Sequence, residues 1–314
     1  MSVESAFAVG LASLVLALAG FTVVARDSFA AVVGFVVYGM LLSLAWMSLG
    51  CPDVALTEAA VGGGVTGALL LGACARLRSE DSAPADQPGI RVRALALLLC
   101  LAVSGGLAGV VLWLPDPAPT LAPEATRQLA ATGLGNPVTA VLMAYRALDT
   151  MLEKVVLLLA LVAVWSLAPD RFWGGRPAFG YRVEAGGPLI FLTRILAPVG
   201  VIAGVYLFWV GADAPGGAFA GGAILSAMWL LGFLSGFALT PSIGGFWLRF
   251  TLVVGVCVFL SAGLAGFAIA TGFLAYPAGL EKPVILLIEI AMTLSIGATL
   301  GLLVAGAPGH PAQS

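Results

Sequence analysis

Long runs of apolar residues dominate this sequence and restrict the folds open to it. A membrane span takes about 20 apolar residues to cross roughly 30 Å of hydrocarbon. Nine runs reach that length, and turn-forming Pro, Gly and Asp residues separate them. The runs are residues 3–25, 28–50, 54–75, 92–114, 148–168, 189–210, 218–239, 247–270 and 284–306. The sequence therefore predicts an all-α fold, a polytopic membrane helix bundle of about nine transmembrane helices.

The composition agrees with a chain whose solvent is mostly lipid. Of its 314 residues, 61% are hydrophobic and 10% are charged, whereas a soluble domain has about 25% charged residues. A net charge of −2 excludes a basic nucleic-acid-binding surface. The four cysteines are scattered and the one histidine is His310, so no metal-ligating spacing occurs. We expect no metal, no cofactor and no enzymatic centre in this chain.

Positive charges are distributed unevenly between the runs. Cytoplasmic loops carry an excess of Lys and Arg, and with the N-terminus outside only Arg127 and Lys282 fall on the outer side. The arginines on the inner side are Arg26, Arg76, Arg78, Arg91, Arg93, Arg171, Arg176, Arg182 and Arg249. This bias predicts an N-out, C-in topology. The first run is too long, and too acidic at Glu4, for a cleaved signal peptide, and we expect it to be a span.

Two polar stretches divide the chain into three blocks. Residues 76–91 and 169–188 contain many Pro, Gly and charged residues, which favours cytoplasmic linkers. The blocks are a three-helix block at 1–75, a two-helix block with a charged segment at 92–168, and a four-helix block at 189–314.

Ionisable residues inside a membrane span are costly and mark functional sites by default. The first pair lies in the segment CPDVALTEAAVGGG, which contains Asp53 and Glu58. Asp53 follows a proline and serves either as a helix N-terminal cap or as part of an ion path. Glu58 lies more than one turn deeper and precedes three glycines that let another helix approach closely. We therefore expect Glu58 to face protein and favour a functional role for it.

The second group is Arg146, Asp149, Glu153 and Lys154. Spacings of three and four place the first three on one helical face. Two carboxylates one turn apart repel each other unless a cation or a proton lies between them. Arg146 can neutralise one of them, and Lys154 offers a second basic group from the flank. We favour a role in proton or cation transfer, and the alternative is a structural salt-bridge cluster.

A third ionisable residue, Glu289, has no charged neighbour within its own predicted helix. It must therefore find a partner on another helix, take up a proton or meet water. Arg194 is one candidate partner, although we expect its side chain to extend to the cytoplasmic surface instead. The glycine-rich stretch Gly211–Ile224 lacks the Lys and Ser/Thr of a phosphate-binding loop. It favours a tight turn that leads into a closely packed helix.

These same stretches resemble a known family. The segment CPDVALTEAAVGGGVTGALLL is similar to the MbhD-like segment of Mrp antiporters and membrane-bound hydrogenases, and NPVTAVLMAYRALDTMLEKVVLL is similar to the MbhE-like segment that follows it. RILAPVGVIAGVYLFWVGADAPGGAFAGGAIL and the closing LEKPVILLIEIAM resemble the MnhB/MrpB family. The resemblance implies an MnhB/MrpB-type subunit of an Mrp-type Na⁺/H⁺ antiporter, fused to MbhD-like and MbhE-like segments.

The resemblance also implies that Glu58, Arg146, Asp149, Glu153 and Glu289 occupy family positions. With Asp53 and Lys154, which the sequence itself singles out, they form the predicted ion or proton pathway. Two of these depart from the family pattern, since Lys154 replaces an uncharged residue and Glu289 replaces an aspartate. The expected partners are H⁺, Na⁺, the lipid bilayer and other membrane subunits, and the expected location is the prokaryotic inner membrane. Two alternatives are an equivalent subunit of a complex-I-like or hydrogenase-linked assembly, and a structural membrane scaffold without its own ion path.

Overall fold

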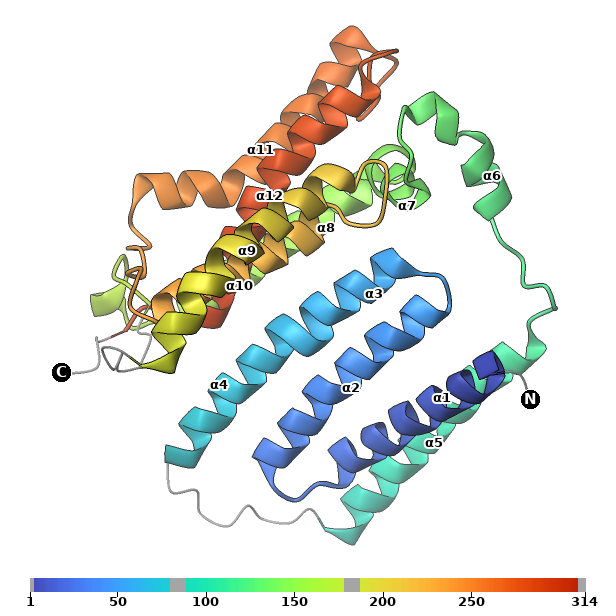
Figure 1. The fold of residues 1–314 in the computed structure, drawn as a ribbon, viewed down its shortest axis with the longest axis vertical. Coiled ribbons are helices and arrows are strands. Elements are labelled where there is room, and N and C mark those ends of the chain that lie inside the picture. The colour runs from blue at the N-terminus through green and yellow to red at the C-terminus, as the bar shows by residue number, and fades with distance from the viewer. Residues whose placement is uncertain (1–2, 80–88, 178–186, 310–314) are drawn as a thin grey trace.

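The computed structural model describes residues 3–79, 89–177 and 187–309, and within these ranges it contains helices and no β-strand. His310 and much of the two predicted linkers lie outside the described residues. Figure 1 shows the helices running roughly side by side. An all-helical membrane fold is what the apolar runs predict, because a helix satisfies its own backbone hydrogen bonds in lipid.

The N-terminal block contains three long helical segments. Helix α1 spans Val3–Val24 and α2 spans Ser28–Ser48. The third segment is continuous, with α3 at Pro52–Glu58, a π-helical stretch η1 at Ala59–Val65, and α4 at Thr66–Ser79. Helix α4 thus extends past residue 75, the predicted end of the block, and into the predicted linker.

The three glycines after Glu58 let η1 pack closely against α2. A Cβ added to Gly39 of α2 would lie 2.8 Å from the backbone nitrogen of Gly63, closer than real Cβ atoms come. The expected close approach of another helix is therefore confirmed, and the approaching helix is α2.

The second block contains short elements that the apolar runs do not predict. Helix α5 spans Ile90–Trp113 and α8 spans Ala147–Ser166, close to two of the runs. The elements between them are α6 (Ala122–Arg127), the 3-10 turn η2 (Leu129–Thr132), α7 (Pro137–Ala140) and the π-helical η3 (Val141–Tyr145). Together α7 and η3 carry the chain into α8, and they place several polar side chains beside the C-terminal block.

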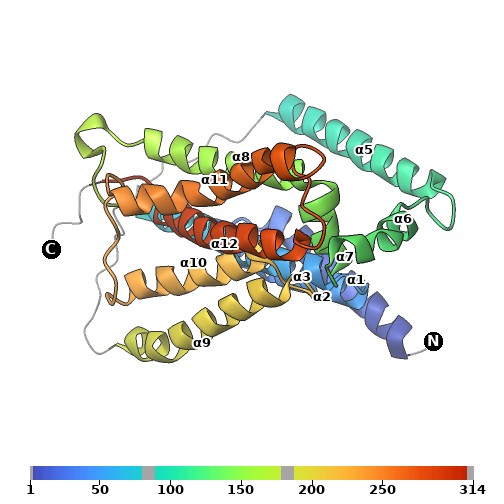
Figure 2. The same ribbon diagram turned by 90° about the horizontal axis from the view of Figure 1, so that it is seen from above.

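The C-terminal block is organised around one buried helix. Its helices are α9 (Pro188–Val210), α10 (Ala218–Leu234), α11 (Phe246–Ile269) and α12 (Glu281–Ala305), preceded by the 3-10 turn η4 (Asp170–Phe172). Figure 2 shows α12 between α10 and α11, and it contacts both. Helix α8 also packs on α12. The main core joins Ile288 and Ile296 of α12 to Phe259 of α11 and Met151 of α8.

The described helices include one for each predicted span. Seven are long and apolar enough to cross a membrane. The other two expected spans are α8, whose Asp149, Glu153 and Lys154 add three charges, and α10, which has 17 residues. The chain is therefore a multi-pass membrane protein by length and composition, while the count of nine and the N-out orientation stay predictions.

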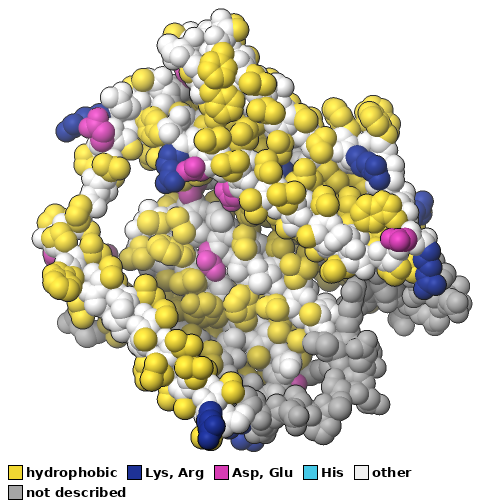
Figure 3. All heavy atoms as spheres, turned by 180° about the vertical axis from the view of Figure 1, so that it is seen from behind, with side chains coloured by type: hydrophobic (Ala, Val, Ile, Leu, Met, Phe, Trp, Pro, Cys, Tyr) yellow, Lys and Arg dark blue, Asp and Glu magenta, His cyan; other side chains and the backbone are white. Residues whose placement is uncertain are grey.

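Apolar side chains cover much of the surface. They gather over most of the face drawn in Figure 3, where the acidic side chains are few. Helix α5 has no buried residue, and its Leu112 and Trp113 are largely exposed. Such a surface suits lipid or the apolar faces of other membrane helices.

Candidate functional site

A cavity of about 560 Å³ brings together residues from four separate parts of the chain. Four of the seven predicted pathway residues line it: Asp53 from α3, Glu153 and Lys154 from α8, and Glu289 from α12. The remaining wall is largely apolar and includes Leu142, Met143, Leu157, Phe219, Met292 and Ile296. Ionisable groups on the wall of a mostly apolar cavity are the usual setting of a functional site in a membrane protein.

Glu289 is the most deeply buried carboxylate of this cavity. The residue is 3% exposed, and its carboxylate lies against the start of α10, where a Cβ on Gly217 would be 3.7 Å from Oε1. Of the three possibilities that the sequence leaves open for Glu289, contact with another helix is therefore met at the start of α10. One oxygen, Oε2, has no hydrogen-bond partner among the described residues. A buried carboxylate oxygen left free in this way is able to accept a proton, a water molecule or a cation.

Lys154 is buried on the opposite side of the cavity. The residue is 2% exposed, and its Nζ donates to the hydroxyl of Thr299 at 2.9 Å. The Thr299 hydroxyl in turn donates to the backbone carbonyl of Ser295 at 2.6 Å. Since that hydroxyl has one proton to donate, Lys154 is the donor of their shared bond.

The two buried groups lie along one face of α12. Glu289 and Thr299 are ten residues apart, which corresponds to about 15 Å along a helix at about 1.5 Å per residue. Met292 and Ile296 lie between them on the same cavity wall. The cavity therefore has a carboxylate toward one end of α12 and an amine toward the other.

Asp53 lies where the N-terminal block meets the rest of the chain. Its Oδ1 accepts a hydrogen bond from the Gly216 N–H at 3.0 Å and another from Asn136 Nδ2 at 3.3 Å. No side chain caps α3. Both of these partners belong to other segments, so Asp53 connects blocks instead of capping its own helix.

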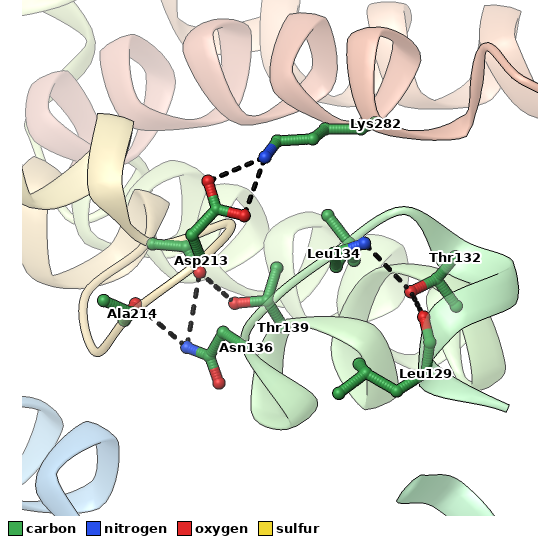
Figure 4. A network of polar contacts seen from close by, with 9 residues as sticks. Leu129, Thr132, Leu134, Asn136, Thr139, Asp213, Ala214 and Lys282 are labelled. Atoms are coloured by element: carbon green, nitrogen blue, oxygen red, sulfur yellow. Dashed lines mark hydrogen bonds and ion pairs between the residues drawn. The ribbon is translucent and has the colours of Figure 1, made fainter. Parts of the chain in front are cut away.

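Asn136 is the centre of a polar junction beside the cavity. Its Nδ2 also donates to the carbonyl oxygens of Gly211 and Ala214, and its Oδ1 accepts from the Val138 N–H near the start of α7. Thr139 donates to the same Gly211 carbonyl at 2.6 Å. Figure 4 shows these side chains pointing toward the loop that precedes α10. The junction holds the second block against this loop of the C-terminal block, which the sequence predicts to be a tight turn.

An ion pair joins the same loop to the start of α12. Lys282 Nζ lies 2.7 Å from each carboxylate oxygen of Asp213, as Figure 4 also shows. The Asp213 side chain is 53% exposed, so the pair fixes geometry more than it adds stability.

The charged residues on the exposed side of α8 lie apart from the buried Lys154 and Glu289. Arg146 neutralises Asp149, as expected, through a largely exposed ion pair of 2.5 Å, and neither residue lines the cavity. Glu153 forms no ion pair among the described residues, and it is exposed where it meets the cavity. Arg194 is exposed, and its guanidinium carbon lies 5.7 Å from the centre of the Phe237 ring, so it does not pair with Glu289.

Glu58 also lies outside the cavity wall, half-buried and packed along its own helix. Its Oε1 lies against Gly62, in the space that a Cβ there would need. Among the described residues, no group of three His, Cys, Asp or Glu side chains comes together in a way that could hold a metal ion.

Comparisons with known proteins agree with this architecture. The MbhD family, named for the D component of MBH, matches residues 13–79, and a domain related to the MnhB component of Na⁺/H⁺ antiporters matches residues 188–308. A curated relative, the A/B component of a probable K⁺/H⁺ antiporter from Rhizobium meliloti (strain 1021), is 28% identical over 276 residues. That alignment covers 76% of this chain and 26% of the relative, so the chain spans about a quarter of that protein.

Two solved structures share the fold. A chain of the Mrp complex from Dietzia sp. DQ12-45-1b superposes with a TM-score of 0.71 at 24% identity, covering 97% of this chain and 35% of that one. A chain of the membrane-bound sulfane sulfur reductase, an archaeal respiratory membrane complex, gives 0.56 at 25% identity and covers 68% of this chain and 99% of that one. The chain therefore carries a segment that matches the MbhD family ahead of a domain related to MnhB, and it resembles subunits of Mrp-type antiporters.

Proposed function

We propose that this chain works within a multisubunit Mrp-type cation/proton antiporter of a prokaryotic inner membrane and contributes to its proton or sodium path. The observation that carries the proposal is the cavity on which Asp53, Glu153, Lys154 and Glu289 converge. Its supports are the free oxygen of Glu289 and the buried amine of Lys154. Both groups are expensive to bury in a membrane, which favours a functional reason for their presence.

The path that we propose begins at the exposed Glu153 and continues to the buried Lys154 and Glu289. Carboxylates and amines each gain and lose one proton, so they can pass protons in sequence. About 15 Å separates the Glu289 and Thr299 positions along α12, which is too far for direct transfer, and water in the cavity would bridge it. A volume of about 560 Å³ leaves room for several water molecules.

The other three predicted residues are proposed to lie where an ion approaches this path. Arg146, Asp149 and Glu58 lie outside the cavity wall. The first two are exposed, two turns and one turn before Glu153 along the chain. An ion that reaches Glu153 from that direction would pass them first.

The proposed partners are other membrane subunits, because the solved structures that share this fold are chains of larger membrane complexes. The test is ion transport in membrane vesicles from cells that lack their own cation/proton antiporters. Vesicles with the whole complex should show cation-driven proton flux, and vesicles with a complex that lacks this chain should not. Liposomes that contain this chain alone should also be inactive. Full flux from the complex without this chain would refute the proposed path.

A second assembly is favoured by one specific observation. This chain covers 99% of a chain of the sulfane sulfur reductase complex, against 35% of the Mrp complex chain. An equivalent subunit of a complex-I-like or hydrogenase-linked assembly would line the same ion path, driven by electron transfer elsewhere. Copurification of the native complex separates the two: redox proteins among the partners would favour this assembly, and antiporter proteins alone would favour the first.

A further inference from the structure

Asp53 and Glu289 reach neighbouring residues just before α10. The Gly216 N–H donates to Asp53 Oδ1 at 3.0 Å. The next residue, Gly217, lies against the Glu289 carboxylate, since a Cβ on Gly217 would be 3.7 Å from Oε1. A carboxylate of the MbhD segment and a carboxylate of the MnhB domain are thus joined through a short stretch of backbone.

This stretch of backbone is tightly packed. The Gly217 N–H donates to the Leu207 carbonyl of α9 at 2.9 Å. Gly217 has φ = 101°, a conformation that residues with a side chain rarely adopt. A Cβ on Gly211 would collide with the Gly217 backbone. Because this backbone has little freedom to adjust, a displacement at Gly216 would be transmitted to Gly217.

Both donors to Asp53 are neutral. They are the Gly216 amide and the side-chain amide of Asn136, which is itself anchored to the Gly211 and Ala214 carbonyls at 3.3 and 3.1 Å. Asp53 forms no ion pair with a basic side chain among the described residues. Asp53 therefore acts as a hydrogen-bond acceptor, and no basic side chain of the described residues pairs with its charge.

From this geometry we propose that Asp53 is a positioning residue, which holds the start of α10 against Glu289 by accepting the Gly216 hydrogen bond. This inference rests on the proposed role of Glu289 in ion transfer. Asparagine at position 53 has an amide oxygen of the same shape and accepts the same bonds. The positioning role therefore requires a hydrogen-bond acceptor at position 53 and does not require a negative charge there.

The test measures the reactivity of Glu289 in the assembled complex. Dicyclohexylcarbodiimide modifies carboxyl groups in apolar surroundings, and mass spectrometry of the peptide that contains Glu289 reports its labelling rate separately from that of other carboxyls. In Asp53→Ala, the start of α10 should move and free the Glu289 carboxylate that packs against it. Labelling of Glu289 should then accelerate by about tenfold, the scale of losing one hydrogen bond to a charged group. Asp53→Asn should label Glu289 at the wild-type rate.

Thr57 provides a matched control on the same helix. It lines the same cavity, and its hydroxyl donates to the Asp53 backbone carbonyl at 3.0 Å, within α3 itself. Thr57→Val should leave Glu289 labelling unchanged. If Thr57→Val accelerated labelling as much as Asp53→Ala does, a general disturbance of the cavity would replace the positioning role.

Two further results would overturn the inference. One is an Asp53→Ala complex that labels Glu289 at the wild-type rate. The other is an Asp53→Asn complex that labels Glu289 rapidly, because the charge of Asp53 would then be required. If the Asp53→Ala complex does not assemble, the Glu289 labelling rate of Asp53→Asn, compared with that of the wild type, decides whether the charge of Asp53 is required. The labelling readout needs no turnover, so it remains decisive even if Glu289→Gln transports normally and the proposed function fails.

Discussion

The Lys154 amine on α8 donates a 2.9 Å hydrogen bond to the Thr299 hydroxyl on α12, a residue 145 positions later in the chain. This contact ties the charged second block to the most buried helix of the MnhB domain. Within the described part of the chain it is the one hydrogen bond of this amine, which has three N–H donors when charged. The remaining donors therefore face the cavity wall or the water within it.

Lys154→Met tests whether this amine is there for stability. Replacing a buried charge by a well-packed apolar residue is often neutral or stabilising, by up to about 4 kcal/mol. We expect Lys154→Met to keep or raise the thermal unfolding temperature of the purified complex and to slow transport. Thr299→Val is the control, because it keeps the amine but removes its partner, which should cost about 1–3 kcal/mol. A lower unfolding temperature for Lys154→Met than for Thr299→Val would show that Lys154 is structural.

Glu153→Gln tests the exposed entrance of the proposed path. Glutamine has nearly the same shape but cannot exchange a proton, so transport should fall by at least about tenfold while the complex still assembles. The matched control is Asp149→Asn, one turn away, which breaks the exposed pair with Arg146 at a cost of about 0–1 kcal/mol. Proton flux in vesicles measures both variants. Equal, undiminished flux from the two would remove Glu153 from the path.

Asn136→Ala tests the polar junction between the blocks. The change leaves the Ala214 carbonyl oxygen without its side-chain donor, while the Gly211 carbonyl keeps the Thr139 hydroxyl, and burying a group without a partner costs about 1–3 kcal/mol. Thermal unfolding should show a clear loss of stability. Lys282→Met removes the nearby, partly exposed pair with Asp213 and should cost about 0–1 kcal/mol. A larger loss of stability in Lys282→Met than in Asn136→Ala would contradict the central place of Asn136 in the junction.

The N-out, C-in topology is tested by cysteine labelling in intact cells. After the four native cysteines are replaced, single cysteines within 76–91 and 169–188 should resist a membrane-impermeant maleimide. A cysteine at Ala118, in the exposed segment between α5 and α6, should be labelled. Labelling from outside at either predicted linker, with protection at position 118, would reverse the orientation.

Most of the helical architecture could be predicted from the sequence, because apolar runs of span length have few alternatives in a membrane. The ends of α1, α2 and α9 fall within two residues of the predicted runs. The π-helical stretches η1 and η3 were not predicted, because one added residue in a helical turn produces no recognisable spacing of apolar residues in the sequence. The short α7 had a readable signal, since an asparagine followed by a proline is typical of a helix start.

The candidate site was predicted in part. Charged residues inside apolar runs identified Glu153, Lys154 and Glu289, which the structure brings to one cavity. Their partners were missed for a physical reason. Thr299 and the backbone at the start of α10 are ordinary groups in their own helices, and only packing between distant segments brings them to Lys154 and Glu289. The pattern on one helix does not contain that information.

Proton flux through the assembled complex with Glu289→Gln tests the central claim most directly. Glutamine fills the same space and keeps an amide oxygen against the start of α10, but it cannot take up or release a proton. We predict a correctly assembled complex whose cation-driven proton flux is at least about tenfold below wild type at every pH measured. A Glu289→Gln complex that transports at the wild-type rate across the whole pH range would contradict the account.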